Sequence, residues 1–205
     1  MLTISDKGKS SVPLLEPGTY PAICCQIIDL GMQFNETYHS TARKVLIGWE
    51  VLGETVEVNG ETQPRIFSKI YTASLNEKAA LRRDLNAWRG RPFTAQELAA
   101  FDLKAILGAP CLISVIHQTG QTGNTYATLA SISKPPKGYP FPAQSVPSVT
   151  YDIEADDPAK VDELPKWIGE MIRRSGSYEE RVAQTSAPKI EEYGEDGDSD
   201  DDLPF

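Results

Sequence analysis

The chain has 205 residues and a formal net charge of −9, a length that suits one domain with a buried core and an appendage. An acidic total argues against nucleic-acid binding, but residues 1–150 carry 14 Lys and Arg against 12 Asp and Glu, whereas residues 151–205 carry 6 against 17. The charge therefore argues against nucleic-acid binding only for the C-terminal part of the chain. There is no apolar run of signal-peptide length at the start and none of the roughly 18 to 20 residues that span a membrane. We therefore expect a cytoplasmic protein.

The first part of the chain predicts three strands. Residues 18–30 alternate and are rich in β-branched types, which predicts a strand that ends at Gly31. A second strand covers residues 44–51 and can continue to Val58, and a third covers residues 65–71. The Asn59-Gly60 pair between them favours a tight hairpin turn, whose central residues need positive φ. The three cysteines, Cys24, Cys25 and Cys111, lie in strand patterns and are interpreted as buried free thiols.

After residue 71 the apolar spacing becomes helical. Ser74 to Glu77 reads as a capping box before a helix that ends at Gly90, and Thr94 to Glu97 reads as a second one before a short helix ending near Phe101. Two more strands, over residues 111–117 and 125–132, flank a Gly-rich loop. Five strands with a helical insert between the third and fourth is the order of an OB-fold barrel, so we expect a mainly β fold, a five-stranded OB-fold barrel that binds single-stranded DNA, over residues 1–138. A generic five-stranded α+β domain would give a similar order.

The C-terminal part divides into three segments. Residues 139–160 contain Pro, Ser and Asp and are expected to form a linker. Residues 161–174 carry one apolar stripe, which indicates an amphipathic helix that docks on the barrel or, alternatively, contacts a partner or a second copy. Residues 175–205 are expected to be a disordered acidic tail, because the stretch from Ile190 has eight acids and no Lys or Arg.

The third strand carries the strongest binding pattern. Cations and aromatic rings alternate along it, so four side chains share one face: Arg65, Phe67, Lys69 and Tyr71. Such a face suits single-stranded DNA, because cations follow the phosphates and rings stack on the bases. Further cations could extend the track: Arg43, Lys44, Lys134 and Lys137. The alternative is that the cations are ordinary solvated side chains and the rings belong to the core.

Two further groups of residues suggest binding. The helical insert holds four arginines that could contact phosphates or simply be solvated: Arg82, Arg83, Arg89 and Arg91. The chain ends in an acidic run followed by an apolar ring that a partner pocket could bury: Asp200, Asp201, Asp202, Leu203, Pro204 and Phe205. We interpret this tip as a partner-binding element.

Catalysis is not indicated. His39 and His117 have no evident catalytic partner, and neither lies in a spacing that fits a zinc site. No phosphate-binding loop of the Walker type is present. We therefore expect a binding protein with no cofactor and no metal, not an enzyme.

The tip resembles that of bacterial single-stranded-DNA-binding proteins, with Leu203 in place of an isoleucine. The body is similar to the single-stranded-DNA-binding proteins encoded by tailed phages and prophages, in residues 71–74, 85–93, 107–111, 136–138 and 164–168. The resemblance implies an OB-fold, a role in phage DNA replication and recombination, and the host bacterial cytoplasm.

The expected function is sequence-tolerant binding of single-stranded DNA, with recruitment of replication or recombination proteins through the tip. Two other functions stay open at this point: a recombination mediator or annealing protein, and an interaction adaptor that binds no DNA. The sequence also leaves a homo-oligomer open.

Overall fold

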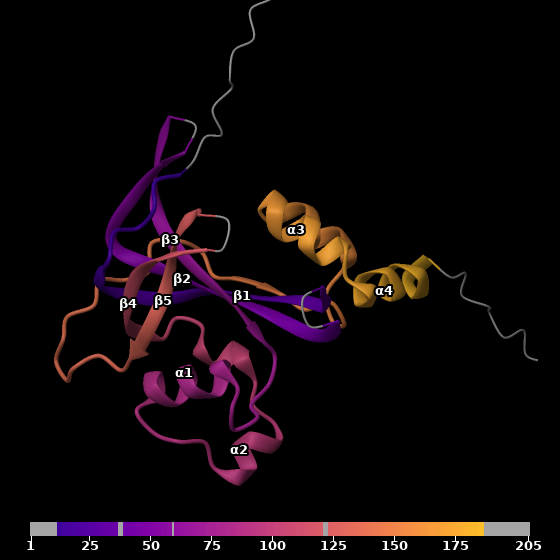
Figure 1. Ribbon diagram of the computed structural model, residues 1–205, viewed down its shortest axis with the longest axis horizontal. Coiled ribbons are helices and arrows are strands. Elements are labelled where there is room, and N and C mark those ends of the chain that lie inside the picture. Colours follow the sequence, from indigo (N-terminus) through magenta and orange to yellow (C-terminus); the bar gives the residue numbers. More distant parts are fainter. Residues whose placement is uncertain (1–11, 37–38, 59, 121–122, 187–205) are drawn as a thin grey trace, which may run out of the picture.

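The computed structural model describes residues 12–36, 39–58, 60–120 and 123–186. The acidic run and the tip, residues 190–205, lie outside this part of the chain. The fold is mainly β (Figure 1), with the strands β1 (Gly18–Asn35), β2 (Ser40–Val58), β3 (Glu61–Thr72), β4 (Pro110–Thr119) and β5 (Thr125–Ser133). These five strands confirm the expected number and order of the strands in the N-terminal part, although most are longer than predicted.

The strands form one curled, half-barrel sheet in the order β3-β2-β1-β4-β5, with antiparallel neighbours. A short strand, β6 (Val149–Tyr151), pairs in parallel with β1. Among the described residues β3 and β5 are not paired. The start of the described chain connects β3 with β4, because Arg65 of β3 donates to the carbonyl oxygen of Pro13 and His117 of β4 bonds that of buried Leu15.

β1 continues past Gly31, where we predicted it to end. Gly31 has φ of +71°, and the register with β2 shifts between Asp29 and Gly31. This irregularity has the character of a β-bulge, which bends a strand without ending it. The prediction of buried free thiols is confirmed, and burial raises the pKa of the Cys24 thiol to about 12.

The helical insert closes the concave side of the sheet. Helix α1 (Ala80–Arg89) packs Leu85 and Trp88 into the main core and ends at Gly90 in the left-handed conformation. The first predicted capping box is wrong, since the N-cap is Ala79 and no side chain caps it. The second is confirmed: Thr94 and Glu97 open α2 (Ala95–Ala99) with both reciprocal hydrogen bonds. A 3-10 turn, η1 (Leu103–Ile106), then leads to β4.

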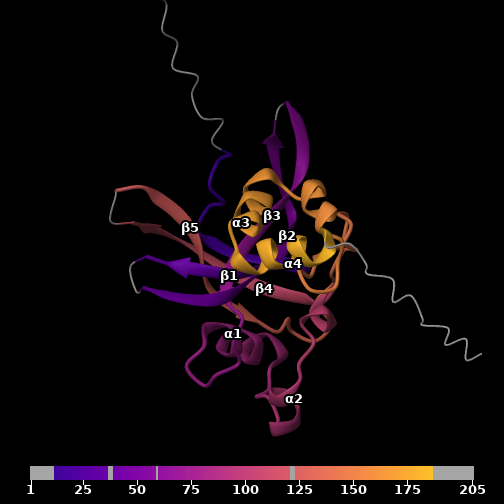
Figure 2. The same ribbon diagram turned by 90° about the vertical axis from the view of Figure 1, so that its right-hand side faces the viewer.

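The C-terminal part is more structured than predicted. The expected linker contains β6 and the first half of η2 (Pro158–Glu163), and residues 176–186, expected in the tail, form helix α4 (Gly176–Ser186). Helix α3 (Lys166–Arg173) buries Ile168 and Ile172 in a second core with Ile28 and Leu46 of the sheet, which confirms the docking interpretation. Figure 1 shows α3 and α4 together on one side of the strands, and Figure 2 views the molecule from that side.

A buried carboxylate holds the segment that we expected to be a linker. Glu50 of β2 is only 4 % exposed and accepts hydrogen bonds from the backbone N–H groups of Ser145 and Val146 and from the Ser145 hydroxyl. Polar anchoring of this kind leaves no hydrophobic pattern in the sequence. Within the described residues, no helix has the length and apolar character needed to span a membrane.

Candidate nucleic-acid interface

The alternation on β3 is correct, but the structure turns that face inward. Phe67 and Tyr71 are 8 % and 3 % exposed and belong to the main core, whereas Ile66 and Ile70 on the opposite face are partly exposed. Rings buried in this way cannot stack on bases, so the prediction of base stacking by Phe67 and Tyr71 is corrected. The reason is that α1 covers the concave side of the sheet.

Lys69 is occupied within the same inward face. Its ammonium nitrogen lies 2.9 Å from Asp84 Oδ2 of α1 and 4.7 Å from the centre of the Tyr71 ring. The Tyr71 hydroxyl also donates to Asp84, at 3.0 Å, and burial followed by the Asp84 charge raises the pKa of this hydroxyl. Lys69 therefore neutralises a buried acid and is not positioned to bind a phosphate.

The other predicted cations fall into two groups. Arg43 bridges Asp29, at 2.6 Å, and Glu154, at 2.8 Å, and Arg65 donates to the Pro13 carbonyl oxygen. Hydrogen bonding to Asp29 is the main cause of the raised pKa of Arg43. The remaining three have no acidic partner in the described part of the chain: Lys44, which donates to the Thr72 hydroxyl, and the exposed Lys134 and Lys137.

The arginines of the insert are mostly engaged in structural contacts. Arg89 and Arg91 both pair with Glu97, and the Arg89 guanidinium lies 4.2 Å from the centre of the Phe93 ring. Hydrogen bonds from Arg91 and from the Thr94 backbone lower the pKa of Glu97 to about 2. Arg82 donates to the Leu75 carbonyl oxygen and Arg83 pairs with Asp84, so the insert offers no cluster of unpaired arginines.

A different surface presents an exposed ring beside a cation. The register of the β1–β2 hairpin pairs Met32 with Arg43 and Phe34 with Thr41. Directly opposed residues of antiparallel strands point to the same face, so these side chains continue the row begun by Asp29 and Val45. Phe34 is 61 % exposed and Met32 is 40 % exposed. We call Met32, Phe34 and Arg43 the hairpin strip.

The post-sheet helices support this hairpin from its other face. The Gln33 side chain donates to the carbonyl oxygen of Met171 in α3, and the Met32 backbone N–H donates to the hydroxyl of Ser177 in α4. A Cβ placed on Gly31 would lie 2.6 Å from the Ser175 hydroxyl oxygen, so glycine is needed here for close approach as well as for positive φ. Backing of this kind holds the strip in place and leaves its outward face uncovered.

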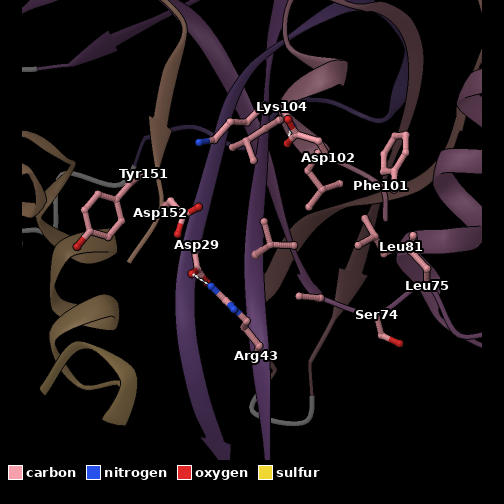
Figure 3. A pocket seen from close by; sticks show the side chains of 14 residues that line it. Asp29, Arg43, Ser74, Leu75, Leu81, Phe101, Asp102, Lys104, Tyr151 and Asp152 are labelled. Carbon is pink, nitrogen blue, oxygen red and sulfur yellow. Dashed lines mark hydrogen bonds and ion pairs between the residues drawn. The ribbon is translucent and has the colours of Figure 1, made fainter. Parts of the chain in front are cut away.

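A pocket of about 350 Å³ lies at the foot of the hairpin strip, between β1, β2 and the insert. We call it the insert pocket. Figure 3 shows apolar side chains from the insert on one side, Leu75, Leu81 and Phe101, and the Asp29–Arg43 pair with Asp152 on the other. Asp102 and Lys104 of the η1 region complete the rim. The volume is near the lower end of the roughly 300 to 1,000 Å³ typical of small-molecule sites.

The sequence pointed to Arg43 but not to the other two residues of the hairpin strip, because Met32 and Phe34 lie beyond the predicted end of the first strand. A signal was present: Phe34 lies two positions after Met32, so the alternation of apolar and polar residues continues past Gly31 up to the polar stretch that begins at Asn35. The tip that we predicted to bind partners, Asp200 to Phe205, lies outside the described residues. In the part of the chain that the structure describes, no group of three His, Cys, Asp or Glu is arranged to hold a metal ion.

Comparison with known proteins adds no family to this description. No family model matches the chain, and no curated protein matches it. The features that bear on function are therefore the geometry of the sheet, the hairpin strip and the insert pocket.

Proposed function

We propose that the protein binds single-stranded DNA with little dependence on sequence, through the hairpin strip, and that its curled sheet is an OB-fold. The strand order β3-β2-β1-β4-β5 and the helical insert between β3 and β4 support the fold proposal. The phage-type replication role and the recruiting tip, which the sequence resemblance implies, belong to the same proposal. The residues of the buried face of β3 are not part of it.

The observation that carries the proposal is the exposed Phe34 ring on the same face of a supported hairpin as Arg43. An aromatic ring that is 61 % exposed offers a stacking surface that every base can use. Met32, which lies opposite Arg43 and precedes Phe34 on this face, adds a polarizable contact that adapts to different bases. Arg43 keeps 41 % of its side chain exposed although it is paired with two acids, so a phosphate can displace the outer acid, Glu154.

A titration of a labelled 20-nucleotide dT strand against the full chain tests this proposal. We expect tighter binding to the single strand than to the matching duplex, and an affinity that falls with salt because phosphate contacts release counterions. Phe34→Ala should weaken binding by about 1 to 3 kcal/mol without changing the circular dichroism spectrum. The matched control is Tyr139→Ala, which removes another exposed ring away from the hairpin.

Absence of single-strand binding at low salt would overturn the proposal and favour the adaptor function. Equal losses for Phe34→Ala and Tyr139→Ala would show that binding occurs elsewhere on the surface. Annealing of complementary strands by the protein alone would favour the mediator function.

A further inference from the structure

We propose that the insert pocket receives a single unstacked base that carries an exocyclic amino group, with cytosine as the probe. This inference rests on the proposed function, because the pocket would hold one base of the single-stranded DNA that the hairpin strip binds. It adds a modest base preference to binding that is otherwise tolerant of sequence.

The insert pocket lies at the end of the path that the hairpin strip defines. Asp29 and Arg43 line the pocket, and Arg43 also lies opposite Met32 in the hairpin register. Phe34 follows Met32 on the same face. A strand stacked on Phe34 and passing Met32 therefore reaches the mouth of the pocket next.

The two walls of the pocket differ in their chemistry. Leu75, Leu81 and Phe101 give one apolar wall (Figure 3), which suits the flat face of a base. On the rim, Asp102 and Asp152 each use Oδ1 to accept a backbone N–H, from Lys104 and Glu154 respectively. For Oδ2 of both groups the structure shows no hydrogen bond among the residues that it describes.

Free carboxylate oxygens select the kind of base. A carboxylate accepts a hydrogen bond from the amino group of cytosine. Thymine has no exocyclic amine, and its one ring donor, N3–H, lies between two carbonyl oxygens, which the carboxylates repel. The acids thus favour amino-bearing bases over thymine.

Lys104 supplies the complementary charge for the backbone. Its side chain is exposed at the pocket rim, and its amine forms no ion pair within 4 Å among the described residues. Its charge reaches Asp156, because the pKa of Asp156 is lowered first by its hydrogen bond from Lys160 and also by the charge of Lys104. A phosphate attached to the captured base can pair with this amine.

The test compares a 20-nucleotide dT strand with the same strand carrying one central dC, both titrated against the full chain. We expect the dC strand to bind about fivefold more tightly. Ala73→Phe should remove this difference and keep the dT affinity, because Ala73 lines the pocket and contributes its backbone N–H, not its methyl group, to the contact with Arg43. Ala130→Phe, at an exposed position of β5 outside the pocket, is the matched control.

Equal affinity of the wild-type chain for the two strands, or a dC preference that survives Ala73→Phe, would overturn the inference and leave the proposed function intact. If neither strand binds, the proposed function fails. NMR titrations of the chain with free dCMP and with free dTMP then test whether the insert pocket binds a base with an amino group. Larger shifts of the Asp102 to Lys104 amide signals with dCMP than with dTMP would support the inference. Equal or absent shifts would overturn the inference.

Discussion

At the scale of single residues, Asp84 decides the role of the third strand. It is buried on the apolar stripe of α1, between Leu81 and Leu85, and accepts hydrogen bonds from Lys69, Tyr71 and Arg83. An acid in such a position needs a cation, because a buried unpaired charge is costly. The Asp84 network therefore converts what reads as a binding face into part of the core.

We expect Asp84→Ala to lower the free energy of unfolding by about 3 to 5 kcal/mol, because Lys69 keeps its charge without a buried partner. Urea denaturation followed by circular dichroism measures this change. The double variant Lys69→Met/Asp84→Leu serves as control, since removing both charges together should restore much of the stability. A stable Asp84→Ala variant with weakened DNA binding would instead indicate that β3 is part of the DNA-binding site.

At the scale of elements, α2 is a five-residue helix that depends on its first turn. The Thr94 hydroxyl accepts the Glu97 backbone N–H, and the Glu97 carboxylate accepts the Thr94 backbone N–H. The same carboxylate pairs with Arg89 and Arg91 and so ties α2 to the end of α1. A helix this short is not stable without such contacts.

Glu97→Gln isolates the charge, because glutamine can still complete the capping box. The pKa of Glu97 in the folded chain is about 2, below the ordinary value of 4.5, so its charge stabilises the folded state above about pH 4.5. This contribution is lost as the pH falls toward 2. We expect the wild type to be more stable than the variant at pH 7, and the difference to shrink across this range in urea titrations. A difference that is independent of pH would show that the charge contributes nothing.

At the scale of the whole molecule, two cores share one sheet. The concave face of the strands packs against the insert, and the other face of β1 and β2 packs against α3. Leu46 of β2 belongs to the second core, while its neighbours Val45 and Ile47 belong to the first. A change in one core is therefore transmitted through the backbone of the same strand.

We expect Ile168→Ala to destabilise the whole chain by about 2 to 5 kcal/mol, since Ile168 is only 1 % exposed. Unfolding should remain one cooperative transition, with far-ultraviolet circular dichroism and tryptophan fluorescence changing together. Lys166→Ala, at an exposed position on the same helix, is the control. Two separate transitions would mean that the post-sheet helices fold as an independent unit.

Local patterns in the sequence determined the five strands of the N-terminal part, the helical insert, the capping box of α2 and the buried thiols. Hydrophobic period and turn residues act over a few positions, so they can be read directly. Which face of β3 lies inside could not be read, because both faces carry large apolar residues: Ile66 and Ile70 on one side, Phe67 and Tyr71 on the other. Alternation with a period of two indicates that the two faces of the strand differ. Which face is buried depends on the helix that packs against it.

The continuation of β1 to Phe34, the anchoring of residues 145–146 by Glu50 and the pairing of Arg43 with Asp29 and Glu154 were likewise decided by the tertiary structure. Each depends on partners distant in sequence, as between Arg43 and Glu154, or on a backbone irregularity such as that at Gly31. The candidate site is built from these features. The sequence specified a β-rich chain with a helical insert, whereas the three-dimensional contacts determined which of its rings and cations remain available to a ligand.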